Sequence, residues 1–305
     1  MKPAPSLARF ARRIVLPSGE HIHLYDSTVD QLGCGNQGHT AWPPIILIHG
    51  LQDESDTWHH IFEPLAERYR VIAPDLPGFG RSEKIRRNYT IEFFVWVVLG
   101  LMDALSIHSA IFIGNSLGAM LAEIIALKHP DRIRKLVMLA GTICWEQPVL
   151  SRVWNFITQD IHTHIQSYRL SLAQLRADTQ GVWEILQSYY ADLTTLPLAD
   201  RDFLLKRLHE RLQDEPQWFA CLSVRQNLLV FFSAQMPALL TLLNQCQVPT
   251  LIVWGKQDRI SSVSRALYRV RLQPSTRLLL LDNVGHLPQQ ENPKALLEVL
   301  WPFLE

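Results

Sequence analysis

The sequence predicts an α/β fold with a mostly parallel central sheet, helices on both faces and an inserted helical cap. Two observations support this prediction. Short apolar runs alternate with helical patterns up to about residue 142, and the alternation returns after about residue 245. Between them, residues 143–245 contain no convincing strand and have helical patterns. We therefore expect a core of residues 1–142 and 246–305, and a helical cap of residues 143–245 over one edge of the sheet.

The strand predictions depend on short apolar or β-branched runs that are bounded by turn signals. An opening hairpin is expected because Ser18-Gly19 separates the first two runs. Continuous apolar runs in the later strands indicate burial on both faces. The predicted strands are Arg12–Pro17, His21–Tyr25, Ile45–Ile48, Arg70–Ala73, Ala110–Ile113, Lys135–Leu139, Thr250–Trp254 and Thr276–Leu281.

Three segments of the core have helical patterns with suitable end signals. Thr90 is suited to cap the first helix, Pro130 follows the second, and Pro293 suits the first turn of the third. Strands that alternate with helices form parallel βαβ units, so we expect helices on both faces of the sheet. The predicted core helices are Thr90–Leu105, Leu117–His129 and Pro293–Leu304.

Composition and charge exclude several classes of partner. The 305 residues include 29 Lys+Arg and 29 Asp+Glu, so no net field favours nucleic acid or an anionic membrane. The most apolar segment, Phe93–Met102, is shorter than the roughly 20 residues that cross a bilayer. Met1–Arg13 lacks the apolar run of a signal peptide. We expect a small-molecule substrate, no nucleic acid and no membrane span; the oligomeric state is not predicted.

Cysteine spacing argues against a metal or redox centre. The four cysteines form no CxxC pair, which excludes the common structural zinc and thioredoxin-like patterns and fits a reducing cytoplasm. No metal or organic cofactor is expected. The cysteines are Cys34, Cys144, Cys221 and Cys246.

Other polar residues have no predicted role in catalysis. Three histidine pairs lack a third ligand at metal spacing, and the first pair is expected on a surface strand. Three acidic residues near position 50 are expected to be solvated turn residues. The histidine pairs are His21/His23, His59/His60 and His162/His164, and the acidic residues are Asp53, Glu54 and Asp56.

One serine lies between a predicted strand and a predicted helix. Ser116 has a glycine two residues to either side, Gly114 and Gly118. A sharp strand-to-helix turn forces the serine towards positive φ and leaves no room for side chains at the flanking positions. The start of the following helix directs free N–H groups at whatever the hydroxyl attacks. The pattern predicts that Ser116 is a nucleophile.

The groups that would activate this serine follow other predicted strands. His286 and Asp258 come after the last two strands, and the carboxyl ends of parallel strands meet at one sheet edge. A serine needs a base, and that base needs an orienting group. The backbone N–H groups of Leu51, after the strand Ile45–Ile48, and of Leu117 are suited to an oxyanion hole.

Together these motifs resemble the α/β-hydrolase fold enzymes that carry a helical cap, over nearly the whole chain outside the cap. The matching stretches are His49-Gly50, Asp75–Ser82, Gly114–Gly118, Asp258 and Gly285-His286, with the order Ser, Asp, His. The resemblance implies Ser116 as nucleophile, His286 as general base and acid, and Asp258 as the group that orients the imidazole. It gives the Asp75–Ser82 loop a structural role. Glu146 is a weaker rival for the acid, because some relatives place it after the strand that ends at Leu139.

The resemblance leaves three functions open. The first is hydrolysis of a carboxylic ester through an acyl-enzyme, with an apolar substrate suggested by aromatic residues in the cap. The second is a carbon–carbon bond hydrolase for β-diketone-like ring-cleavage products, whose members share the Gly-Asn-Ser-x-Gly and Trp-Gly-x-x-Asp stretches. The third is a non-catalytic binding protein on the same fold. A serine at position 116 argues against the dehalogenase and epoxide hydrolase branches, which attack with a carboxylate.

Overall fold

The predicted α/β architecture is present in the computed structural model, which describes residues 2, 4–29, 42–144 and 179–305. Eight strands form one sheet in the order β1-β2-β4-β3-β5-β6-β7-β8. The first two pairings, β1 with β2 and β2 with β4, are antiparallel. The five that follow are parallel, so the prediction of a mostly parallel sheet is confirmed.

The predicted strands and core helices all form, with ends shifted by a few residues. The strands are β1 Ala11–Val15, β2 His21–Asp26, β3 Ile45–Ile48, β4 Val71–Pro74, β5 Ala110–Asn115, β6 Ile133–Leu139, β7 Thr250–Gly255 and β8 Arg277–Leu281. The main helices are α1 Phe62–Ala66, α2 Ile91–Ala104, α3 Leu117–Lys128, α6 Thr179–Tyr189, α7 Leu198–Gln213, α8 Glu215–Leu243, α9 Ser264–Leu272, α10 Pro288–Glu291 and α11 Pro293–Leu304. The predicted cap forms on α2, where the Thr90 side chain accepts a hydrogen bond from the Phe93 N–H at 3.1 Å.

The central strands are buried on both faces, as their continuous apolar runs predict. Successive strand residues point to opposite faces, and in β3 Ile46 and Ile48 join one core while Ile45 and Leu47 join the other. The first core lies under α2, α3 and part of α8, and the second under α1 and α11. Helices therefore cover both faces, which confirms that part of the prediction.

The opening hairpin is less exposed than the sequence predicts. His21 is exposed, but His23 is only 4% exposed, and its Nδ1 lies 3.2 Å from the Asp75 carboxylate. The expectation of a surface strand is therefore wrong for His23. The reason is that β2 is an inner strand, paired with β4 as well as β1, and the Asp75 loop covers it.

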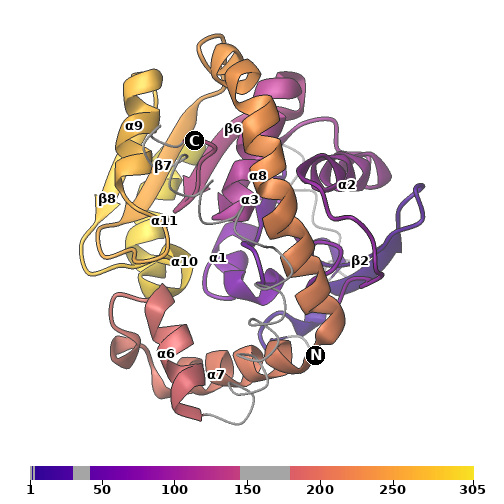
Figure 1. The fold of residues 1–305 in the computed structure, drawn as a ribbon, viewed down its shortest axis with the longest axis vertical. Helices are drawn as coiled ribbons and strands as arrows, with labels where there is room; N and C mark the ends of the chain where they lie inside the picture. The colour runs from indigo at the N-terminus through magenta and orange to yellow at the C-terminus, as the bar shows by residue number, and fades with distance from the viewer. Residues whose placement is uncertain (1, 3, 30–41, 145–178) are drawn as a thin grey trace.

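The part of the chain described between β6 and β7 is helical, as predicted. Figure 1 shows α6 and α7 side by side at one end of the molecule, while α8 crosses α3. The second half of α8 packs into the core of α2 and α3 through Phe231, Phe232 and Leu239. No single described helix is long and apolar enough to span a bilayer; only the two halves of α8, bent by 50° at their junction, pass that test together.

Candidate active site

Ser116 occupies the sharp turn between β5 and α3. Its φ is +52°, a conformation that residues with a Cβ rarely adopt. The Ser116 N–H donates to the Leu139 carbonyl of β6 at 2.8 Å, which ties the turn to the neighbouring strand. A Cβ on Gly114 would lie 2.4 Å from the Gly118 backbone, and one on Gly118 would lie 2.0 Å from the Ile48 carbonyl oxygen. Both glycines are therefore required by the tight approach of β3, β5 and α3.

Two further glycines pack against this serine. A Cβ on Gly141 would lie 2.2 Å from the Ser116 carbonyl oxygen, and one on Gly50 would lie 3.3 Å from the Ser116 Cβ. No role was predicted for Gly141 from the sequence. The signal available was an Ala140-Gly141 pair directly after a predicted strand, a position where a neighbouring loop can approach closely. The loops after β3 and β6 thus enclose the turn that carries the serine.

His286 and Asp258 meet as the sequence predicts for adjacent loops. The His286 Nδ1 lies 2.8 Å from the Asp258 Oδ2, and both side chains are almost fully buried. The other carboxylate oxygen, Oδ1, accepts hydrogen bonds from the N–H groups of Ile260 and Ser261, each at 2.8 Å. Since a carboxylate only accepts, the ring donates from Nδ1 and its Nε2 carries a lone pair in the neutral state.

The loop that carries His286 is fixed by two polar side chains. Asn115, next to the nucleophile candidate, donates from Nδ2 to the carbonyl oxygens of His286 at 3.1 Å and Leu139 at 3.2 Å. Asn115 thus connects the turn at Ser116 to the loops after β6 and β8. Glu291 accepts from the N–H groups of Gly285 and Leu287, on either side of His286, at 2.8 and 3.3 Å.

Glu291 also reaches the helical segment. Its second oxygen accepts from the Ala191 N–H at 2.7 Å, just after α6. Burial raises the pKa of Glu291 to about 7, although its three backbone hydrogen bonds lower the pKa in part. The role of Glu291 was not predicted, because a glutamate before Asn292-Pro293 has no local signal that distinguishes it from an exposed one.

A cavity of about 360 Å³ lies over the serine. Leu51, Ser116 and His286 all line it, so the loops after β3, β5 and β8 share one space. The opposite side comes from the helices between β6 and β7, and most of these side chains are apolar. They include Ile185 and Leu186 of α6, Leu204 and Leu208 of α7, and Trp218 of α8.

Polar side chains of those helices also border the cavity, among them Gln217 and Arg211. The Gln217 Oε1 accepts from the Gly80 N–H at 3.1 Å, while its buried Nε2 has no hydrogen-bond partner among the described residues. Arg211 pairs with Asp53 at 2.7 Å and with Glu54 at 3.0 Å. Gln217 therefore offers a donor to a bound molecule.

The acidic residues after β3 are buried, so the expectation of solvated turn residues is wrong. Asp53, Glu54 and Asp56 are 8%, 0% and 1% exposed. They form an acid–arginine network with Arg81 of the Asp75–Ser82 loop and with Arg207 and Arg211 of α7. Buried carboxylates are stable when paired with cations in this way. The network connects the loop after β3 to a helix that lines the cavity.

The Asp75–Ser82 loop has the structural role that the resemblance implies. The Asp75 Oδ1 accepts from the Ser55 N–H at 2.7 Å, and its Oδ2 accepts from the Arg81 N–H at 2.7 Å. Burial alone would raise the pKa of Asp75, but Arg81 and His23 outweigh it and hold that pKa well below its usual range. His49 also joins this loop, because its Nε2 accepts from the Leu76 N–H at 2.9 Å.

The structure thus brings most of the predicted site residues together around one cavity. Ser116, His286 and Leu51 line it, Asp258 lies behind His286, and Leu117 is the first residue of α3. N–H groups in the first turn of a helix have no intrahelical acceptor, as the oxyanion prediction for Leu117 requires. The rival acid Glu146 lies outside the described residues, as do Cys34 and the pair His162/His164.

Comparison with known proteins identifies the family. Residues 43–293 match the family model of the alpha/beta hydrolase fold. An uncharacterized protein of Mycobacterium tuberculosis is 26% identical over 86% of this chain and 75% of its own length. The 2-hydroxy-6-oxononadienedioate/2-hydroxy-6-oxononatrienedioate hydrolase 2 of Pseudomonas putida is 28% identical over 86% of this chain and 87% of its own. The crystal structure of Cfl2 from Burkholderia cenocepacia has a TM-score of 0.77 at 21% identity, over 100% of this chain and 99% of that one. The chain therefore belongs to the α/β hydrolase fold family.

Proposed function

We propose that this protein is a serine hydrolase that cleaves the ester-type acyl bond of a small, largely apolar substrate through an acyl-enzyme. One observation carries the proposal. Ser116, held at positive φ, shares a cavity with His286, and the Nδ1 of His286 lies 2.8 Å from the Asp258 carboxylate. A hydroxyl, a base and an orienting acid in this order are what acyl transfer to serine requires.

The proposed reaction has two halves. The Ser116 hydroxyl attacks the ester carbonyl while the His286 Nε2 takes its proton, and Asp258 stabilises the imidazolium that forms. The tetrahedral intermediate then expels the alcohol, which receives that proton from His286, and leaves an acyl-enzyme. Water attacks the acyl-enzyme with His286 again as base, and the acid product leaves as Ser116 regains its proton.

The oxyanion of each tetrahedral intermediate needs two donors. We assign this role to the backbone N–H groups of Leu51 and Leu117, which belong to the loop after β3 and the first turn of α3. The positive end of the α3 dipole adds to their effect. Each such donor is typically worth ~10²–10³-fold in kcat.

The substrate class follows from the cavity walls. We propose that the helices between β6 and β7 act as a cap, because α6, α7 and α8 each contribute side chains to the cavity that holds Ser116. Most of these side chains are apolar, which favours an aliphatic or aromatic acyl or alcohol group. The free Gln217 Nε2 suits one polar atom of that group.

The direct test is a comparison of Ser116→Ala with the unaltered chain and with Ser233→Ala, which removes an exposed serine of α8. We expect p-nitrophenyl butyrate hydrolysis to fall by at least ~10³-fold in Ser116→Ala only, with an unchanged unfolding midpoint. A fluorophosphonate probe should label the unaltered chain and Ser233→Ala, but not Ser116→Ala. Hydrolysis that survives in Ser116→Ala would refute the assignment, and a failure of the unaltered chain to react with the probe would favour a non-catalytic binding protein.

A second candidate reaction uses the same site. The Pseudomonas putida relative, at 28% identity, is by its name a hydrolase of 2-hydroxy-6-oxononadienedioate and 2-hydroxy-6-oxononatrienedioate. That name favours a carbon–carbon bond hydrolase as the second candidate for this chain. For this chain the same reaction would need His286 to move a proton to carbon before cleavage. A substrate panel separates the two, because a kcat/KM for a vinylogous diketone far above that of every ester would replace the ester proposal.

A further inference from the structure

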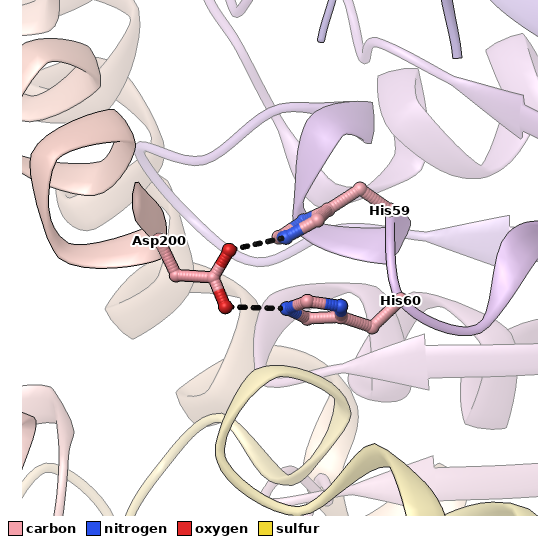
Figure 2. A group of neighbouring side chains, drawn as sticks. All are labelled: His59, His60 and Asp200. Atoms are coloured by element: carbon pink, nitrogen blue, oxygen red, sulfur yellow. Dashed lines mark hydrogen bonds and ion pairs between the residues drawn. The ribbon is translucent and has the colours of Figure 1, made fainter. Parts of the chain in front are cut away.

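Two neighbouring histidines and one aspartate form a cluster outside the cavity. His59 and His60 follow the 3-10 helix η4, Ser55–Trp58, and Asp200 lies in the first turn of α7. The His60 Nε2 is 3.0 Å from the Asp200 Oδ2, and the His59 Nε2 is 3.8 Å from the Asp200 Oδ1 (Figure 2). All three ligand atoms lie within 4.8 Å of one another. Asp200, 140 residues from His60, is a third side chain of metal-ligand type that sequence spacing did not reveal.

The hydrogen bonds of His59 fix which ring nitrogen holds its proton. Its Nδ1 lies 2.9 Å from the Asp56 carbonyl oxygen, which can only accept, so Nδ1 is the donor. The Nε2 of the neutral ring then carries a lone pair. That atom is buried, has no hydrogen-bond partner among the described residues, and faces a carboxylate oxygen.

The His59 Nε2 lone pair and the Asp200 Oδ1, 3.8 Å apart, are both electron-rich, so a cation between them is favoured. An imidazole whose Nδ1–H is bonded to a backbone carbonyl, with Nε2 directed at other ligands, is the usual arrangement of a metal-binding histidine. The cluster therefore has the electronic arrangement of a metal site.

We propose that His59, His60 and Asp200 bind a zinc ion through the two Nε2 atoms and a carboxylate oxygen, with water as the fourth ligand. Nitrogen and carboxylate ligands at about 2.0–2.1 Å suit tetrahedral Zn²⁺, and such ligands lie roughly 3.3 Å apart. The two Nε2 atoms lie 3.0 and 3.8 Å from different oxygens of the Asp200 carboxylate, and all three ligand atoms lie within 4.8 Å of one another, so their separations are near that value. The His60 and Asp200 side chains are 31% and 20% exposed, which leaves access for the ion and its water.

The proposed ion has a structural role. It joins the loop after η4 to α7, the helix whose Leu204, Leu208 and Leu212 line the cavity. None of the three proposed ligands lines the cavity. Arg207 and Arg211 hold the same helix further along through the acid–arginine network. Zinc at Asp200 would fix the other end of α7. The site does not depend on the proposed reaction at Ser116.

The test is zinc binding by the full chain, prepared with a chelator and without a polyhistidine tag. Titration calorimetry with zinc chloride should give roughly one ion per chain, and the unfolding midpoint should rise with zinc concentration. Asp200→Asn and His60→Gln should each weaken binding by at least ~10-fold. Their matched controls, Asp202→Asn and His209→Gln, alter exposed residues of the same helix, α7, and should bind zinc as the unaltered chain does.

Two results would overturn the proposal. One is no binding of zinc up to ~1 mM by the unaltered chain. The other is equal affinity in the unaltered chain, Asp200→Asn and His60→Gln, which would mean that zinc binds elsewhere. Circular dichroism of each metal-free variant separates lost ligands from lost folding, and either ligand variant alone is enough for the comparison. Ester hydrolysis is not a readout here, so failure of the function proposal leaves this test intact.

Discussion

Asp56 is the carboxylate on which the acid–arginine network depends, and its replacement by asparagine gives a stringent test of that network. Its two oxygens accept from Arg81 at 2.9 and 3.0 Å and from Arg207 at 2.6 Å, and the Tyr25 hydroxyl donates to it as well. The pKa of Asp56 is lowered, because these partners outweigh the effect of burial. Asp56→Asn keeps the shape of the side chain but removes its charge.

The expected loss of folding stability is large, because water cannot solvate the buried arginines once the charge of Asp56 is removed. The side chains of Arg81, Arg207 and Asp56 are 4%, 5% and 2% exposed, so two guanidinium groups would face an amide NH₂ group inside the protein. Breaking a buried ion pair by removing one partner typically costs about 3–5 kcal/mol in the free energy of unfolding. At about 2 °C per kcal/mol for a chain of this size, the unfolding midpoint should fall by roughly 6–10 °C.

The assay is urea and thermal unfolding followed by circular dichroism, with Asp103→Asn as control. Asp103 pairs with Arg132 at 2.6 Å, but its side chain is 66% exposed. A surface pair contributes less than about 1 kcal/mol, so the control should change the midpoint little. If Asp56→Asn also costs less than about 1 kcal/mol, burial does not strengthen this pair and the reasoning is refuted.

Three further changes test how the loops of the site are held. Gly118→Ala places a Cβ 2.0 Å from the Ile48 carbonyl oxygen, where no rotamer relieves the clash, so the free energy of unfolding should fall by about 3 kcal/mol or more; an unchanged thermal midpoint would contradict this. Asn115→Ala leaves the buried carbonyl of His286 without a donor and should lower the free energy of unfolding in urea by about 1–3 kcal/mol. Asn115→Asp should also be less stable than the unaltered chain, because a carboxylate cannot donate to that carbonyl. Burial of Glu291, whose pKa is about 7 in the folded chain and lower when unfolded, should make stability fall as pH rises from about 4.5 through 7. In Glu291→Gln that part of the pH dependence of stability should vanish. A profile of stability against pH identical to that of the unaltered chain would show that Glu291 is not its source.

The sequence by itself determined the sheet and the turn at Ser116. Both depend on local sequence patterns. Apolar runs predict the buried strands, and Gly114 and Gly118 mark the turn where the backbone of β3 and α3 leaves no room for a side chain. The meeting of His286 with Asp258 was also predictable, because parallel strands bring their carboxyl ends to one edge whatever the residues between them.

Only the tertiary structure decided the state of the polar residues after β3. Asp53 and Asp56 look like solvated turn residues in the sequence, and they are buried because Arg211 and Arg207 reach them from 158 and 151 residues away. Asp200 reaches His60 across a similar distance. The charge state and burial of such a residue depend on which side chain covers it after folding, and no local pattern encodes that partner.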